Sequence, residues 1–201
     1  MNALMSQISQ YEPVVIAAVV LAIVIEFFWH RVHGREGYDL GETAATTAIA
    51  VGQSFTRYLS AFIIVPGYYA IYQWRLFDIP LFDPLALVAL FLGQELCYYW
   101  FHRASHTVRW MWATHRVHHS ATKFNLSAAY RLGWTNLISA GWLFYAPLLL
   151  IGFQPVAVIG AIGLSLAYQF LLHTELVPKL GPLEFVRNST DRVWSLRSPT
   201  N

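Results

Sequence analysis

The stretch QELCYYWFHRASHTVRWMWATHRVHHS, residues 94–120, carries most of the information about fold and function in this sequence. It starts inside an apolar run and ends in two histidine-rich boxes, HRASH and HRVHHS. Five of the eight histidines of the 201-residue chain lie in this window. His102 and His106 are four residues apart, so on a helix that continues from the apolar run they project from one face and can reach one metal ion.

The second box repeats this pattern. His118 and His119 follow His115 by three and four residues, which again predicts a single helical face with two adjacent side chains able to serve two ions. Imidazole binds a metal as the neutral base, and its ordinary pKa near 6.5 leaves much of it neutral at cellular pH. Spacing does not choose among Zn, Cu, Fe and Ni. The alternative to a metal site is a surface of His and Arg that binds anionic headgroups.

Composition predicts a membrane protein. Hydrophobic residues make up 56% of the chain and charged residues only 12%, with a mean hydropathy of +0.43. The apolar content excludes a disordered chain, and the single cysteine, Cys97, excludes a disulfide scaffold. A net charge of +2 is too small to indicate a nucleic-acid partner.

Apolar runs predict an all-α bundle with about four membrane spans. The first run covers residues 13–29. The third begins near Phe82 and Pro84, where proline favours a helix start, and continues through residue 101. Residues 43–72 read either as an interfacial turn before a span from residue 58 or as one long tilted helix. Residues 136–152 and 155–172 predict a helical hairpin whose first arm is bent by Pro147.

The distribution of Lys and Arg predicts the orientation. Eleven of the thirteen basic residues fall in residues 29–42, 102–135 and 173–201, and lysine and arginine concentrate in cytoplasmic loops. The histidine boxes are therefore expected on the cytoplasmic face of a multi-pass protein. Of the cations there, we expect Arg103, Arg109, Arg116, Lys123 and Arg131 to face anionic headgroups or an acidic electron-donor protein.

Other candidate residues have two interpretations each. Glu95 lies two helical turns before His102 on the same face. It is either a functional group within a span or a hydrogen-bond partner of a neighbouring helix. His173 is a further ligand candidate, whereas His30 and His33 are expected to be interfacial caps. The aromatic residues around the first box form either a substrate channel or an interfacial belt: Tyr98, Tyr99, Trp100, Phe101, Trp110 and Trp112.

The two boxes, the flanking QELCYYWFHR, the following NLSAAYR and the later LLHTELVPKLGPLEFV resemble the fatty acid hydroxylase or sterol desaturase superfamily, particularly its bacterial members and those of the alkylglycerol monooxygenase type. The resemblance implies an integral membrane, non-haem di-iron enzyme that uses dioxygen and electrons to hydroxylate or desaturate a sterol, fatty acyl or alkyl lipid. It implies these iron ligands: His102, His106, His115, His118, His119 and His173.

The resemblance also implies a division of the chain into three parts and a cellular location. Residues 1–80 would be N-terminal membrane helices, 81–187 the hydroxylase-like domain and 188–201 a divergent tail, in a bacterial inner membrane. We expect Glu95, Tyr98, Tyr99 and Trp112 to line the substrate channel. No Rossmann or flavin fingerprint appears in the sequence, which predicts an external electron donor.

The tail departs from the family pattern. The family has a final H-x-x-H-H box shortly after the segment matched here by GPLEFVRN, but this sequence continues STDRVWSLRSPTN. Glu175, Glu184 and Asp191 are carboxylates there without the expected spacing. This predicts a truncated member with an impaired site, and the competing class is a non-enzymatic membrane metal-binding protein.

Overall fold

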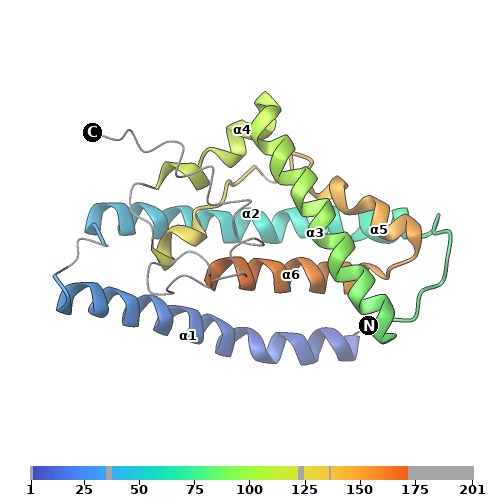
Figure 1. Ribbon diagram of the computed structural model, residues 1–201, viewed down its shortest axis with the longest axis horizontal. Coiled ribbons are helices and arrows are strands. Elements are labelled where there is room, and N and C mark those ends of the chain that lie inside the picture. The colour runs from blue at the N-terminus through green and yellow to red at the C-terminus, as the bar shows by residue number, and fades with distance from the viewer. Residues whose placement is uncertain (1, 35–37, 122–124, 136, 172–201) are drawn as a thin grey trace.

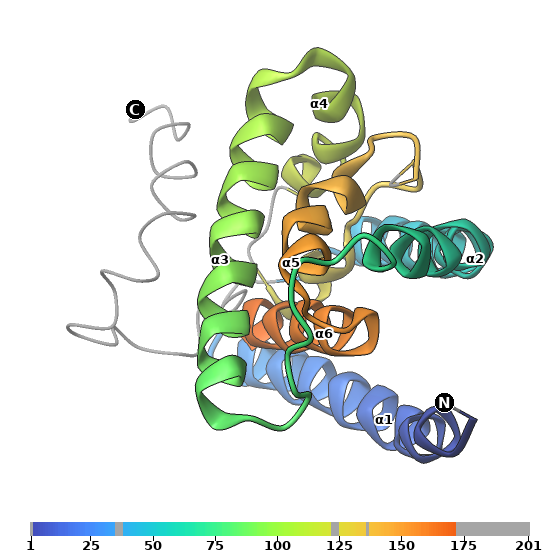
Figure 2. The same cartoon turned by 90° about the vertical axis from the view of Figure 1, so that its right-hand side faces the viewer.

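The computed structural model of the chain describes residues 2–34, 38–121, 125–135 and 137–171. Within these ranges every regular element is a helix, as the sequence predicts. The helices α1 (Asn2–Val32), α2 (Leu40–Tyr72) and α6 (Pro155–Leu171) have roughly parallel axes, and α3 (Pro84–Thr107) crosses them steeply (Figures 1 and 2). The histidine boxes therefore lie at one end of this crossing helix.

Helix α2 resolves the two interpretations of residues 43–72 in favour of one long helix. Asp39 caps its first turn by accepting a hydrogen bond from the backbone N–H of Glu42 at 2.7 Å. The polar residues in its middle do not break it, because the hydroxyls of Ser54 and Ser60 donate to carbonyls of their own helix at 2.9 and 2.7 Å. A helix can carry such residues at membrane depth when their hydrogen bonds are made internally.

Helix α3 confirms the predicted start at Pro84. Asp83 precedes it and accepts a hydrogen bond from Ala86 N–H at 2.9 Å, and the missing N–H of proline costs nothing in the first turn. The helix continues to Thr107, so His102 and His106 lie on its last turns. Val108 is extended, which reverses the chain into the short helix α4 (Arg109–His115).

The second box differs from the prediction of one helical face. Helix α4 ends at His115, and His118 and His119 lie in a separate 3₁₀ turn, η1 (His118–Ser120). A 3₁₀ turn has about three residues per turn instead of 3.6, so its side chains diverge from those of an α-helix. Two further turns follow, η2 (Leu126–Tyr130) and η3 (Gly141–Tyr145).

The predicted hairpin has a bent first arm. Its first arm is η3 followed by α5 (Ala146–Ile151), with Pro147 in the first turn of α5, and α6 forms the second arm. Gly152 makes the reversal between them with φ of +129°, and a Cβ there would lie 2.1 Å from the Phe77 carbonyl oxygen. Only glycine fits this close backbone approach.

Two described helices, α2 and α3, are long and apolar enough to cross a membrane, whereas the apolar helices Gly141–Ile151 and Pro155–Phe170 are shorter. Large apolar side chains of α2 and α3, such as Phe62 and Leu85, are exposed. An apolar exposed surface of this kind is typical of a lipid-facing or protein-facing helix. The number of about four spans stays a prediction.

The buried apolar core lies where α2, α3, α5 and α6 meet. Leu149 and Val158 are fully buried at its centre, and Tyr68 donates a hydrogen bond to the Trp142 carbonyl at 2.9 Å. Its buried members are Tyr68, Leu90, Tyr145, Leu148, Leu149, Phe153 and Val158. This core holds α3 in place against α6 and thereby fixes the position of its histidine-bearing end.

A buried carboxylate ties α1 to the segment that follows the second box. Glu26 is fully buried, accepts a hydrogen bond from Leu126 N–H at 2.7 Å, and accepts another from the Tyr38 hydroxyl. Burial and the Glu26 contact raise the pKa of Tyr38, which keeps this hydroxyl protonated as a donor. Glu26 thus anchors η2 across about 100 residues of sequence.

We expect Glu26→Ala to lower the free energy of unfolding by about 1–3 kcal/mol, because the buried Leu126 N–H loses its acceptor. Glu26→Gln retains an oxygen acceptor and should lose less. Thermal unfolding of the detergent-solubilised chain, followed by tryptophan fluorescence, measures the effect. Ile25→Ala, at an exposed neighbouring position, is the control; equal melting temperatures for it and Glu26→Ala would contradict the anchor.

Candidate metal centre

Four histidines from three consecutive elements converge at the end of α3. His102 and His106 come from α3, His115 from the end of α4 and His119 from η1. Each offers a ring nitrogen, and these four atoms all lie within 4.8 Å of one another. The chain reversal at Val108 makes this possible, because it folds the second box back onto the first.

The distances within the group fit a metal ion. The Nε2 atoms of His102 and His106 are 3.1 Å apart, and so are those of His115 and His119. A Zn–N(imidazole) bond is about 2.0–2.1 Å long, which places neighbouring ligand nitrogens about 3.0–3.4 Å apart in tetrahedral or octahedral geometry. Each of these two pairs is therefore spaced as neighbouring ligands of one first-row ion are, and the four ligand nitrogens lie within 4.8 Å of one another.

Burial keeps His115 in the form that binds metal. Burial, reinforced by the neighbouring histidines, lowers the pKa of His115 to about 2. A neutral imidazole retains the lone pair that a metal requires. The group favours the metal interpretation over a cationic headgroup surface, since a ring that resists protonation contributes no positive charge.

The other two predicted ligands, His118 and His173, do not belong to this group of four. The His118 ring centroid is 5.4 Å from that of His119 and 5.8 Å from that of His115, beside the group. His173 lies outside the described residues. The described part of the chain therefore brings together four of the six predicted ligands and places His118 next to them.

His30 and His33 have different environments. The His33 ring stacks on Trp29 at 4.4 Å and its Nδ1 contacts the Trp29 carbonyl at 2.8 Å, at the exposed end of α1, as a helix-end residue would. The prediction of an interfacial cap is wrong for His30, which is 1% exposed. It is buried because α1 packs against the segment that Glu26 holds.

The predicted channel residues divide into two sets. The Trp112 ring lies 5.5 Å from His106 and 5.7 Å from His119, and the Tyr98 ring lies 5.6 Å from His102. Tyr99 is exposed, and its hydroxyl accepts a hydrogen bond from Arg103 at 3.1 Å. Trp112 and Tyr98 therefore border the histidines, whereas Tyr99 faces outward.

Glu95 has the partner that the alternative interpretation expects. Its Oε1 accepts a hydrogen bond from the Ser165 hydroxyl of α6 at 2.9 Å. The sequence singled out Glu95 but gave no signal for Ser165, because a serine in an apolar helix has many ordinary roles. Its pairing with a carboxylate depends on how α3 and α6 pack.

The expectation that all the basic residues near the histidine boxes face headgroups or a donor protein is wrong for Arg131. It is buried, forms a salt bridge with Glu42 at 3.2 Å and donates to the Thr46 hydroxyl at 3.0 Å. Its guanidinium also contacts the Ser120 hydroxyl at 3.4 Å, next to His119 in sequence. Arg131 thus connects the start of α2 to the second histidine box, while Arg103, Arg109 and Arg116 are exposed around it.

Comparison with known proteins identifies the family. The fatty acid hydroxylase family model matches residues 87–194, more than half of the chain and all of the converging histidines. The chain belongs to the fatty acid hydroxylase family. No solved structure matches it.

Several curated relatives carry the name alkylglycerol monooxygenase. The human protein is 43% identical over 123 residues, which cover 59% of this chain and 27% of the relative. The Xenopus tropicalis protein is 35% identical over 187 residues, covering 90% of this chain and 40% of the relative. The chain thus spans between about a quarter and two fifths of the length of these relatives.

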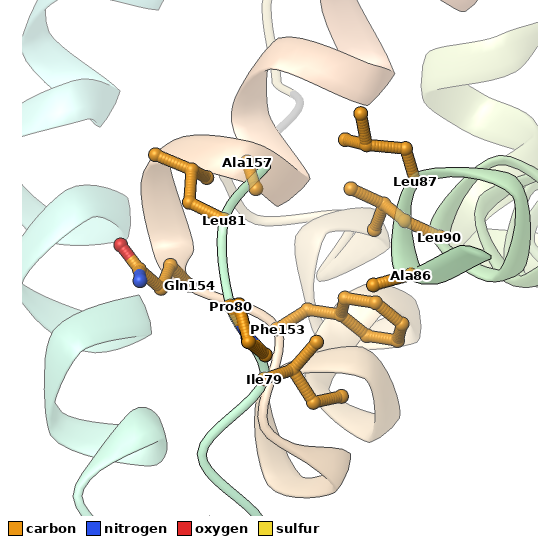
Figure 3. Close-up of a pocket in the computed structure, with 9 residues that line it drawn as sticks. All are labelled: Ile79, Pro80, Leu81, Ala86, Leu87, Leu90, Phe153, Gln154 and Ala157. Atoms are coloured by element: carbon orange, nitrogen blue, oxygen red, sulfur yellow. The ribbon is translucent and has the colours of Figure 1, made fainter. Parts of the chain in front are cut away.

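A small apolar pocket lies far from the histidines of this hydroxylase-family chain. It is formed where the connection before α3 meets the starts of α3 and α6, among Ile79, Leu87, Phe153 and Ala157 (Figure 3). Since a helix rises about 1.5 Å per residue, the roughly 15 residues from Leu87 to His102 separate the two by about 22 Å. The pocket is therefore a packing feature at the opposite end of α3.

We expect Arg131→Met to lower the free energy of unfolding by about 3–5 kcal/mol, because it leaves Glu42 as a largely buried charge without its cation. The change should also reduce the metal bound by the histidine group, since Ser120 loses a contact beside His119. Thermal unfolding and elemental analysis measure the two effects. Arg75→Met removes a surface pair with Asp78 and is the control; equal losses in both variants would contradict this role of Arg131.

The metal-free chain should lose stability as the pH falls below about 6.5. An unfolded histidine takes up a proton near pH 6.5, whereas folded His115 resists protonation down to about pH 2, so the unfolded state binds more protons in this window. Unfolding in the presence of a chelator at pH 8, 6.5 and 5 measures the slope. His115→Gln should flatten it and His33→Gln should not; identical slopes in all three proteins would count against the assignment.

Proposed function

We propose that this chain forms the metal-binding part of an iron-dependent membrane oxygenase that hydroxylates a lipid. The observation that carries this proposal is the group of four mutually facing imidazoles inside the segment that matches the fatty acid hydroxylase model. The curated relatives named alkylglycerol monooxygenase favour an alkylglycerol as the substrate class over a sterol or a free fatty acid.

Iron is the metal we assign to this group. When bound, it supplies the redox chemistry that allows dioxygen to oxidise a C–H bond. His102, His106, His115 and His119 would hold one ion through their ring nitrogens. We propose His118, beside this group, and His173 as ligands of a second ion, which makes the centre di-iron.

The residues around the group support a lipid substrate. Trp112 and Tyr98 lie against the histidine rings and would exclude water from the reacting carbon. The exposed apolar surface of α3 gives a lipid chain a route along the helix toward its histidine-bearing end. We assign Glu95, Tyr98, Tyr99 and Trp112 to this route.

Exposed cations support an orientation and an electron donor. Arg103, Arg109 and Arg116 surround the two boxes on the outside of the protein. Positive residues next to a span favour the cytoplasmic side, and they attract anionic headgroups or an acidic protein. We therefore place the centre on the cytoplasmic face of an integral membrane protein that receives electrons from an external donor.

The test combines metal content with product formation. The detergent-purified chain is loaded with Fe²⁺, freed of unbound metal and analysed for iron, then incubated with a saturated alkylglycerol, ascorbate and ¹⁸O₂. We expect about two irons per chain and an ¹⁸O-labelled product by mass spectrometry. His102→Ala and His119→Ala should each retain about one iron per chain or less and lose more than about tenfold in labelled product, because each removes a ligand of one ion.

His33→Ala is the matched control, since it removes an exposed histidine outside the group. A saturated fatty acid and a sterol, tested in parallel, decide the substrate class. Iron at about two per chain without any labelled lipid would overturn the oxygenase and leave a metal-binding protein. Iron that is unaffected by both histidine variants would overturn the metal centre itself.

A further inference from the structure

A continuous chain of side-chain hydrogen bonds connects the histidine group to a carboxylate inside the helical bundle. The Tyr98 hydroxyl lies 3.4 Å from the Nδ1 atom of His102 and donates to the Gln169 side-chain oxygen at 2.8 Å. The Gln169 amide nitrogen donates to the Ser165 hydroxyl at 3.1 Å, and Ser165 donates to Glu95 at 2.9 Å. Four contacts thus lead from a ring of the metal group to Glu95.

The helix geometry explains why these five residues meet. Glu95, Tyr98 and His102 are spaced by three and four residues, so they form one stripe along α3. Ser165 and Gln169 are four residues apart and form the facing stripe on α6. The two helices pack together beside the apolar core, which places one polar stripe opposite the other.

With Glu95 as a carboxylate, these contacts run in one direction. A carboxylate only accepts, so Ser165 donates its single proton to Glu95 and must accept from the Gln169 amide nitrogen. The Gln169 oxygen is then turned toward Tyr98 and accepts the phenol proton. The reverse orientation of the Gln169 amide would place its oxygen next to Ser165 and draw the Ser165 proton away from Glu95.

This direction determines where the proton of His102 lies. Because Tyr98 donates its proton to Gln169, its oxygen can only accept from His102, and Nδ1 of His102 must then carry the hydrogen. The other ring nitrogen, Nε2, is left with its lone pair, and it faces Nε2 of His106 at 3.1 Å. The Tyr98–His102 contact is the longest link, and it is the one whose loss affects His102 directly.

We propose that Glu95, Ser165, Gln169 and Tyr98 form a positioning relay that holds His102 in the Nδ1-protonated tautomer and aims its Nε2 at the metal. The relay rests on the proposed metal centre, but not on the oxidation of a lipid. Metal-bound histidines commonly donate their second N–H to an oxygen, and losing that partner typically costs about 10- to 100-fold in metal affinity. Here the partner is a phenol, oriented by a carboxylate two helical turns away.

The competing interpretation is a polar contact that only fastens α3 to α6. Both interpretations predict a change in stability when the chain is broken, so stability cannot separate them. The relay alone predicts a change in the tautomer of His102 and in metal affinity. The tautomer of His102 and the metal affinity are therefore the two quantities to measure. The melting temperature shows whether each variant folds.

The first experiment measures Co²⁺ affinity by its visible absorption in the full detergent-solubilised chain. Tyr98→Phe removes only the hydroxyl next to His102. Ser165→Ala breaks the relay at a residue that is two contacts away from Tyr98. We expect each to weaken Co²⁺ binding by about 10- to 100-fold, and Ser165→Thr, which retains a hydroxyl, to restore affinity to within about threefold of the parent.

The matched control is Ser60→Ala. It makes the same chemical change at another buried serine, whose hydroxyl donates to a carbonyl of its own helix and has no link to the histidines. We expect this variant to bind Co²⁺ as the parent does. Should Ser165→Ala fail to fold, Tyr98→Phe and Ser165→Thr still decide the affinity reading.

The second experiment reads the tautomer in the metal-free chain labelled with ¹⁵N-histidine, at a pH at which the rings are neutral. The ¹⁵N shifts should show His102 protonated at Nδ1 in the parent and a mixture of tautomers in Tyr98→Phe, with His102→Gln used to assign the signal. Unchanged affinity and an unchanged tautomer in Tyr98→Phe would overturn the relay. A parent that binds no Co²⁺ but shows this tautomer shift would instead overturn the metal centre.

Discussion

The convergence of four imidazole rings at the end of α3 is the constraint on which the rest of this structure depends. Rings whose ligand atoms lie within 4.8 Å of one another cannot all be protonated, because the positive charges would repel in a partly buried site. The fold must therefore hold the histidines in their neutral form before any metal binds. Burial does so for His115, whose pKa is strongly lowered.

Three polar contacts from other helices support this group from different sides. Glu26 of α1 holds the backbone at Leu126, Arg131 links Ser120 to the start of α2, and Gln169 of α6 contacts Tyr98 next to His102. In each case a buried or partly buried donor meets an acceptor. Each helix thus contributes to the centre through its contacts with the histidine-bearing segments and not through a ligand of its own.

The apolar surface and the polar centre occupy different parts of the same helix. Leu90 of α3 packs in the core and Leu85 faces outward, while His102 and His106 lie about three to six turns further along. This arrangement places the histidine group at the end of an apolar helix, where the proposed lipid chain and metal would meet. It is also why the small apolar pocket near Leu87 has no part in the proposed chemistry.

The sequence by itself determined the helical class and a start of α3 near Pro84, because these depend on local periodicity and spacing. Spacing also paired the histidines within each box, whereas the family resemblance implied that both boxes belong to one site. The sequence also identified Glu95 as a candidate, since it shares a helical face with His102, and Tyr98 as one of the aromatic residues around the first box. The sequence left open whether residues 43–72 form one helix, because it did not show that the serine hydroxyls bond to their own backbone.

Only the tertiary structure decided the rest, because these features depend on residues that are distant in sequence. The end of α4 at His115 moved His118 and His119 into a separate turn, and the packing of α2 against η2 buried Arg131 beside Glu42. Ser165 and Gln169 carry no signal in an apolar helix until α6 packs against α3. Periodicity shows which residues share a face, but only packing shows what that face contacts.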